Sequence, residues 1–349
     1  MKNILPKFGG MIANGFDDLA SNKTKLKVYD KCLPFSHGRS AMIWLVNNNN
    51  FNSCLMCNYT WPAIPELMKK LKLKIGFYDL YEKSLEKKIQ MLDGKVLVII
   101  PVFYGFKPWI DYISLQNKFK NKISILIDGA QTAYSHIYYP IKKNIYVLSC
   151  PHKSLGIGDG AILKYSTINK LQKKNYLKLT EEKGFSSIKI KSRKLLNSRN
   201  LTKEKVGLKL SKKLEEAWAS FPSKRMSKSS YQMLIRIDPK KHKKLRINNF
   251  EYMKKNLKKI FKPIDKLDPI CPFGYPILFE KREKLLKELY KKRIFATSLW
   301  DKNKYITKKY KNSYLYKKNF LALPLDQRYS YKDLDEMMMK IKKIVKRIN

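Results

Sequence analysis

The sequence predicts an α/β fold, with a mixed, mostly parallel sheet between helices and a smaller α/β domain after it. Between residues 53 and 163, short apolar runs alternate with segments able to form helices, which is typical of strands joined by crossover helices. The runs are continuously apolar, as in sheets that are buried on both faces. With 44% hydrophobic residues in 349, the chain has ample material for a packed core.

Four apolar runs are the clearest strands of the large domain. They are Val96–Pro101, Ile123–Ile127, Ile145–Leu148 and Gly160–Leu163. Before them, the Ser-His-Gly-Arg-Ser segment at 36–40 leads into the apolar-periodic stretch 41–46, which predicts a glycine turn followed by the start of a helix.

Residues 164–260 are rich in lysine and poor in glycine, and their pattern is mostly helical. We interpret them as a helical connector. We therefore assign residues 1–240 to a large domain, with an N-terminal arm and this connector, and residues 241–349 to a small C-terminal domain.

The small domain is predicted from three short elements and a final helix. Tyr275–Phe279 reads as a strand, Arg282–Lys292 as a helix and Ile294–Ala296 as another strand. Ser330 can cap the last helix, with Asp333 three residues on. The apolar stripe of that helix consists of Leu334, Met338, Ile341, Val345 and Ile348.

The charge is unusual, because 74 Lys and Arg against 28 Asp and Glu give a formal +46. The excess is spread along the whole chain with many Asn, Ile, Tyr and Phe residues, which is the signature of an AT-rich coding sequence. A field of this sign also steers anionic small molecules toward the protein. A non-specific nucleic-acid binder stays open as an alternative, although no nucleic-acid motif is visible and no specific nucleic-acid partner is expected.

Cysteine usage and hydropathy indicate a cytoplasmic protein without a membrane span. The five cysteines form no paired framework, as expected in a reducing compartment. No apolar run reaches the roughly 18 residues that a membrane span needs, nor resembles a signal peptide. Cys54 and Cys57 form a C-x-x-C without a second pair, so we interpret them as buried strand residues and expect no metal site.

Two residues that could carry chemistry follow predicted strands. Asp128 stands directly after the run 123–127, where open α/β sheets bind their ligands. Lys153 comes 25 residues later, after the next strand, and before a glycine-rich turn at 156–160. An amine that can form an imine and an acid that can pair with a protonated pyridine nitrogen are what a pyridoxal 5'-phosphate (PLP) site requires.

The order and spacing of these motifs resemble the DegT/DnrJ/StrS family of PLP-dependent nucleotide-sugar aminotransferases. The family pattern is a strand followed by Asp-x-Ala-Gln, then a strand followed by Ser-x-x-x-Lys and a glycine turn, as at 128–131 and 149–160 here. Further similarities are Gly38-Arg39-Ser40-Ala41, Tyr59-Thr60-Trp61, Lys224-Arg225-Met226-Ser227, Tyr275-Pro276 and the tail from Leu323 to Tyr329. The tail resembles a divergent branch associated with surface-polysaccharide gene clusters.

The resemblance implies the fold-type-I PLP-dependent transferase fold and a role for each matched residue. Lys153 would be catalytic and bind the cofactor covalently. The remaining cofactor-binding residues would be Gly38, Arg39 and Ser40 around the phosphate, Trp61 against the ring, Asp128 at the pyridine nitrogen, Gln131 near the ring oxygen, and Ser149 and Arg225. Two positions depart from the family: Ser149 lies four residues before Lys153 instead of five, and Ser223 replaces an asparagine that the partner subunit donates.

The implied activity is transamination of a nucleotide-linked keto-sugar, with glutamate as amino donor, for surface polysaccharide such as lipopolysaccharide. The resemblance also implies a homodimer with the active site at its interface. Two alternatives remain open here. One is a catalytically altered protein of this fold that acts as a regulator or scaffold. The other is a cysteine desulfurase-like enzyme, since His152 precedes Lys153 and Cys271 is a late cysteine.

Overall fold

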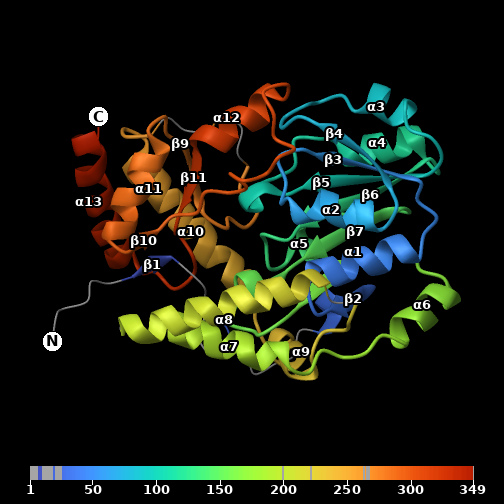
Figure 1. Cartoon of the computed structure of the whole chain (residues 1–349), viewed down its shortest axis with the longest axis horizontal. Helices are drawn as coiled ribbons and strands as arrows, with labels where there is room; N and C mark the ends of the chain where they lie inside the picture. The colour runs from blue at the N-terminus through green and yellow to red at the C-terminus, as the bar shows by residue number, and fades with distance from the viewer. Residues whose placement is uncertain are drawn as a thin grey trace.

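The computed structural model describes residues 7–9, 19, 26–198, 200–220, 222–261, 264 and 268–348. A seven-stranded sheet forms its centre, in the order β2-β8-β7-β6-β5-β3-β4 (Figure 1). The strands are β2 (Cys32–Phe35), β3 (Ser53–Cys57), β4 (Lys74–Tyr78), β5 (Val96–Pro101), β6 (Ile123–Gly129), β7 (Ile145–Ser149) and β8 (Ala161–Lys164). β8 runs opposite to the other six strands of this sheet, so the predicted mixed, mostly parallel sheet is confirmed.

The four strands named from sequence are all present, with ends that differ by at most two residues. Cys54 and Cys57 are buried in β3, as predicted. The pattern did not single out β2 and β4, which are the two edge strands. β2 contains Pro34 and β4 is only partly buried, so neither shows a continuous apolar run.

Helices surround the sheet and fill the connector, as the helical pattern of residues 164–260 predicts. In chain order they are α1 (Gly38–Asn47), α2 (Ala63–Lys70), α3 (Glu86–Gln90), α4 (Tyr112–Phe119), α5 (Ser135–Tyr138), α6 (Lys170–Leu177), α7 (Phe185–Leu196), α8 (Leu201–Ser220), α9 (Lys228–Leu234), α10 (Pro239–Leu257), α11 (Arg282–Lys291), α12 (Lys311–Asn319) and α13 (Tyr331–Ile348). In Figure 1, α7 and α8 lie side by side along the lower edge of the molecule.

The two faces of the sheet bury different partners, because side chains alternate along a strand. On one face, Leu126 of β6 and Leu148 of β7 pack with Trp44 of α1 and Met68 of α2. On the other, strand residues such as Ile127 and Val147 belong to a larger core that continues into the C-terminal elements. Position along a strand therefore decides on which face a side chain lies.

The C-terminal elements form the second, smaller α/β unit that the sequence predicts. β9 (Tyr275–Leu278) pairs antiparallel with β11 (Phe320–Leu323), and β10 (Ile294–Phe295) pairs parallel with β1 (Phe8–Gly9). The predicted stripe of α13 is buried, and the Ser330 backbone N–H and hydroxyl both donate to Asp333. Helix α10 crosses the predicted boundary at residue 240, and that boundary stays a prediction. Within the described part, no helix is both long and apolar enough to cross a membrane.

Candidate active site

The carboxyl ends of β5, β6 and β7 meet at one edge of the sheet. In the parallel register, Asp128 lies opposite Pro101 on one side and Leu148 on the other. Paired residues in a parallel ladder share a face. Asp128 therefore lies on the face that α1 covers, at the edge where open α/β sheets bind ligands.

Asp128 is a partly exposed carboxyl whose charge interacts with Lys153. Its Oδ1 accepts a hydrogen bond from the Ala130 backbone N–H at 3.1 Å. Loss of water raises the pKa of Asp128, and the positive charge of Lys153 opposes that shift. Both groups also act on the thiol of Cys150, which lies between them in the sequence. The structure thus brings together the acid and the amine singled out from the sequence.

Lys153 ends a short 3-10 turn (Pro151–Lys153) directly after β7. Its backbone N–H donates to the Cys150 carbonyl at 3.0 Å, and its side chain is exposed. The residue lines a cavity of about 60 Å³ between the sheet edge and the C-terminal unit. Other lining residues are Gly9, Arg246, Phe273, Gly274, Phe295, Thr297, Ala322, Leu323, Pro324, Leu325 and Asp326.

The first turn of α1 approaches the end of β7 closely. His37 caps the helix, because its Nδ1 accepts from the Ser40 backbone N–H at 3.0 Å. A Cβ added at Gly38 would lie 3.1 Å from the Cys150 sulfur, so glycine permits this approach. Unpaired N–H groups at a helix start attract anions. Because Cys150 and Leu148 lie on the α1 face, this helix start lies on the same face of the sheet as Asp128.

Arg39 and Trp61 lie against each other near this helix start. The guanidinium of Arg39 stands 5.0 Å from the centre of the indole ring, which is 41% exposed. Ser40 is buried, and its hydroxyl contacts that of Ser36 at 3.0 Å and accepts from the Lys224 backbone N–H at 3.3 Å. The segments 38–41, 59–61 and 224–227, which resemble family motifs, are thus joined locally.

Ser149 points away from this cluster. Its Oγ is fully buried and accepts from the His136 backbone N–H at 2.9 Å, with the His136 ring Nδ1 at 2.7 Å. Leu148 and Cys150, its neighbours, lie on the α1 face, so Ser149 lies on the opposite face. Ser149 stands one residue closer to Lys153 than the serine of the family pattern, and this shift places its side chain on the opposite face of the sheet. We therefore exclude Ser149 from the residues that would bind the phosphate.

Gln131 and Arg225 also have defined contacts. Gln131 Oε1 accepts from the Tyr104 backbone N–H at 2.8 Å, and its amide nitrogen donates to no residue that the structure describes. Arg225 forms an isolated antiparallel bridge with Phe35, the last residue of β2, and its Nε donates to the Leu179 carbonyl at 2.9 Å. Strands β2 and β8 separate Arg225 from β7, so within one chain it is not brought to Lys153.

Two residues of α7 contribute buried cations that the sequence reading missed. Arg193 donates to the carbonyls of Leu155 at 3.3 Å, Ile157 at 2.6 Å and His152, all in the loop around Lys153. Lys189, one turn earlier, is buried, and burial lowers its pKa far below the ordinary value. Among so many lysines, no sequence signal separates these positions from exposed ones.

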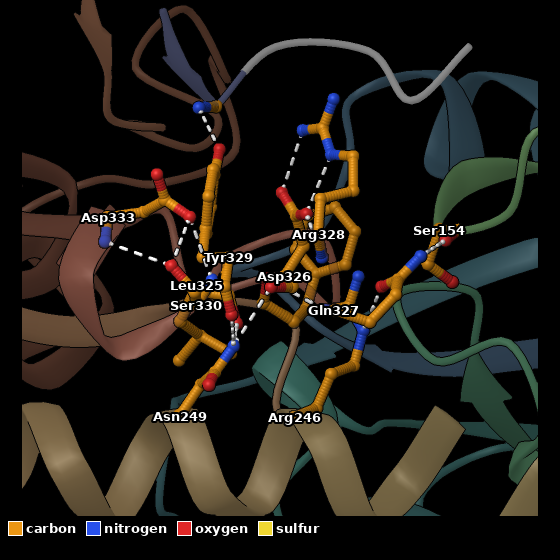
Figure 2. Close-up of polar contacts among 12 residues, drawn as sticks. Ser154, Arg246, Asn249, Leu325, Asp326, Gln327, Arg328, Tyr329, Ser330 and Asp333 are labelled. Carbon is orange, nitrogen blue, oxygen red and sulfur yellow. Dashed lines mark hydrogen bonds and ion pairs between the residues drawn. The ribbon is translucent and has the colours of Figure 1, made fainter. Parts of the chain in front are cut away.

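A second network links α10 and the tail to the same loop (Figure 2). Arg246 Nε donates to Gln327 Oε1 at 3.0 Å, and Gln327 Nε2 donates to the Ser154 carbonyl at 2.9 Å. The adjacent Asp326 accepts from Arg328 at 2.7 and 2.8 Å. The tail motif that resembled the family thus ties the small unit to the residue after Lys153.

Cys271 is buried, and burial raises the pKa of its thiol to about 11. Its sulfur lies 3.7 Å from His242 Nδ1, under the loop that docks on the turn at Tyr104 and Gly105. A desulfurase needs an exposed thiolate on a mobile loop. The environment of Cys271 therefore does not support that alternative.

The fold is that of known PLP-dependent aminotransferases. DesV from S. venezuelae superposes with a TM-score of 0.65 and 11% identity over 97% of this chain and 91% of that one. PseC from Helicobacter pylori, an aminotransferase of pseudoaminic acid biosynthesis, gives 0.60 and 14% over 98% and 100%. A DegT/DnrJ/EryC1/StrS aminotransferase from Brucella abortus gives 0.61 and 14% over 94% and 92%. No family model and no curated protein matches the sequence. At these identities the likeness establishes the fold.

Proposed function

We propose that this chain is a PLP-dependent aminotransferase that transfers an amino group from glutamate to a nucleotide-linked keto-sugar, for surface-polysaccharide biosynthesis. The observation that carries the proposal is the meeting of Lys153 and Asp128 at the carboxyl edge of the sheet, in a fold shared with such enzymes. The strongly positive chain also favours an anionic substrate such as a nucleotide sugar.

The residues present fit the cofactor. A partly desolvated carboxyl such as Asp128 pairs well with a protonated ring nitrogen, and the positive end of the α1 dipole favours a phosphate at the helix start. When bound, PLP supplies an electron-withdrawing ring that stabilises the negative charge developing beside the amino nitrogen. Arg39 adds positive charge near the phosphate, and the exposed indole of Trp61 offers a flat surface for the ring.

Each residue then has a stated task. Lys153 Nζ would hold the cofactor covalently and, as a free amine, would carry the proton between the two carbon atoms that exchange it. Asp128 would keep the ring nitrogen protonated, and the amide nitrogen of Gln131 would donate to the ring oxygen. Arg225 would act from a second subunit of a homodimer, since within one chain it faces Leu179.

A turnover measurement tests this proposal. PLP-loaded protein mixed with L-glutamate and no acceptor is expected to release about one 2-oxoglutarate per chain, and continued release is expected once a nucleotide-linked keto-sugar is added. Lys153→Ala is the control and is expected to release none. Loaded protein that carries PLP on Lys153 yet releases no keto acid from any amino acid would contradict the enzyme proposal.

That last outcome would favour a catalytically altered binding protein of the same fold. The orientation of Ser149 away from the site is the observation that points to this second candidate, because one side chain expected at the phosphate is absent from it. A binding protein would hold PLP or the nucleotide sugar without exchanging an amino group.

A further inference from the structure

Lys189 of α7 is a buried lysine that the proposed reaction does not use. Its side chain is only 8% exposed. The helix that carries it packs against the glycine-rich loop after Lys153, and two contacts fix that packing. A Cβ added at Gly158 would lie 2.0 Å from Ser186 Oγ, so glycine permits the close approach of α7 at one end. Toward the other end, Arg193 donates to three carbonyls of the same loop.

Lys189 lies on the side of α7 that faces this loop. It stands three residues after Ser186 and four before Arg193, and residues at these spacings share one side of a helix. All three residues are buried. The side chain of Lys189 is therefore enclosed between α7 and the loop that begins at Lys153.

The same loop adjoins the start of α1. The Gly160 backbone N–H donates to the Ser36 carbonyl at 2.7 Å. Ser36 immediately precedes His37, the residue that caps α1. A side chain enclosed under the loop, such as that of Lys189, therefore lies near the helix start as well as near Lys153.

Electrostatic effects agree with this placement. Burial, together with the charges of Arg39 and Lys189, lowers the pKa of His37 to about 3. Burial raises the pKa of the Cys150 thiol to about 11, and the charges of Lys153 and Lys189 oppose that rise. The charge of Lys189 thus acts both on the cap of α1 and on the end of β7.

An anion at the start of α1 would stabilise this group of positive charges. Buried cations that lie close together destabilise one another, and a neighbouring anion offsets that cost and favours the charged form of a lysine. A phosphate carries up to two negative charges and offers three acceptor oxygens. It therefore suits a compact ammonium group beside the positive end of a helix dipole.

The two serines that depart from the family pattern have other partners. Ser149 Oγ contacts the ring of His136 at 2.7 Å, on the opposite face of the sheet. The Ser223 hydroxyl donates to the Ser40 carbonyl at 2.8 Å. Lys189 can supply from α7 the contact that these hydroxyls do not make.

We propose that Lys189 binds the phosphate group of the cofactor at the start of α1, in place of the two serines. This inference rests on the proposed aminotransferase function and assigns a residue of α7 to that site. The positive charge then comes from the same chain as Lys153. Arg193 acts as a positioning residue, because its hydrogen bonds hold α7 against the loop.

A comparison of two ligands isolates the phosphate contact. PLP and pyridoxal attach to Lys153 through the same aldehyde, but pyridoxal lacks the phosphate. The affinity of cofactor-free protein for each ligand is measured from the visible absorbance band. Any effect of a substitution on the Lys153 amine changes both affinities alike, so the ratio of the two affinities reports the phosphate contact.

Lys189→Met is expected to lower the ratio of PLP affinity to pyridoxal affinity by at least about tenfold, in the range of one lost charge-assisted hydrogen bond. Lys189→Arg keeps the positive charge and is expected to recover part of the ratio. If Lys189→Met does not fold, Lys189→Gln, which retains a polar head group, is measured in its place with the same expected loss.

Lys191→Met is the matched control. Lys191 lies on the same helix, two residues from Lys189, but its side chain is exposed. The substitution removes the same charge from the chain without changing the buried side of α7. Because exposed charges are screened by salt, the ratio is expected to stay within about twofold of wild type. Circular dichroism reports that each variant is folded.

Two results would overturn the inference. A folded Lys189→Met protein that binds PLP as tightly as wild type would place the phosphate elsewhere. Equal losses of PLP and pyridoxal affinity would make Lys189 a residue that acts on Lys153 or on the fold. Failure of wild type to attach either ligand is a different result, because it defeats the proposed function itself.

Discussion

The two halves of the candidate site are built in different ways. Asp128 and Lys153 are positioned by backbone: a parallel register sets the end of β6, and a short turn follows β7. Arg246 and Gln327 are positioned by side-chain hydrogen bonds between segments 81 residues apart in sequence. We therefore expect the first half to tolerate changes of its side chains without loss of the fold. In the second half, each side chain supports both the fold and the site.

The largest effect is expected in the strand-end half. Lys153→Ala should slow glutamate-dependent keto-acid release by roughly 10³-fold or more, because both the covalent attachment and the proton carrier are lost. Since the Lys153 side chain is exposed, the free energy of unfolding should change by no more than about 0.5 kcal/mol. Single-turnover kinetics and urea unfolding measure the two. A large stability loss would show that the strand-end half is not independent of the fold.

Asp128→Asn is expected to cost roughly 10²-fold in rate, in the range found when one preorganised polar group at a reacting centre is removed. The same substitution is expected to raise the stability of the cofactor-free protein. Burial raises the pKa of Asp128 above its ordinary 3.8. As the pH rises above about 3.8, the unfolded chain loses this proton more readily than the folded one, so the charged carboxylate lowers the free energy of unfolding.

Cofactor-free Asp128→Asn should therefore be more stable than wild type at neutral pH, with the gain disappearing in acid. Thermal unfolding between pH 3 and 8 checks the sign. An Asn variant that is less stable at neutral pH would mean that the attraction between the charges of Asp128 and Lys153 outweighs the lost hydration.

Low pH is expected to destabilise the whole protein, because all four histidines are buried. Burial lowers the pKa of His37 and His136 to about 3, and those of His152 and His242 well below the ordinary value. The unfolded chain therefore takes up protons that the folded chain does not. Stability should be level above about pH 6.5 and fall below it, by about 1.4 kcal/mol per pH unit for each histidine.

The pH dependence of the free energy of unfolding measures this proton uptake. Replacing His242, which accepts from Arg246, with Gln should remove about one proton from the slope. A slope that stays unchanged in that variant would show that His242 is already charged in the folded protein.

The smallest effect concerns the hydrogen-bonded half. Gln327→Leu should destabilise the protein by about 1–2 kcal/mol, since it leaves the Ser154 carbonyl and one Arg246 donor without this partner. Urea unfolding measures this change in the free energy of unfolding. Equal stability of Gln327→Leu and wild type would remove the distinction between the halves.

The contrast also explains what sequence could predict. The apolar runs 96–101, 123–127 and 145–148 predicted strands of the sheet. Asp128 and Lys153, which follow two of these runs, predicted the half of the site at the strand ends. Ser149 could not be placed, since a shift of one residue inverts the face and motif spacing alone does not show which face is used. Lys189, Arg193 and Arg246 could not be found among 74 basic residues, because their burial depends on tertiary contacts.

The most direct test of the central claim is to reduce the PLP-loaded protein with borohydride and map the modified peptide by mass spectrometry. The account predicts a single stoichiometric pyridoxyl group on Lys153, and none in Lys153→Ala. A pyridoxyl group of equal yield on another lysine, such as Lys189, or one that persists unchanged in the variant, would contradict it.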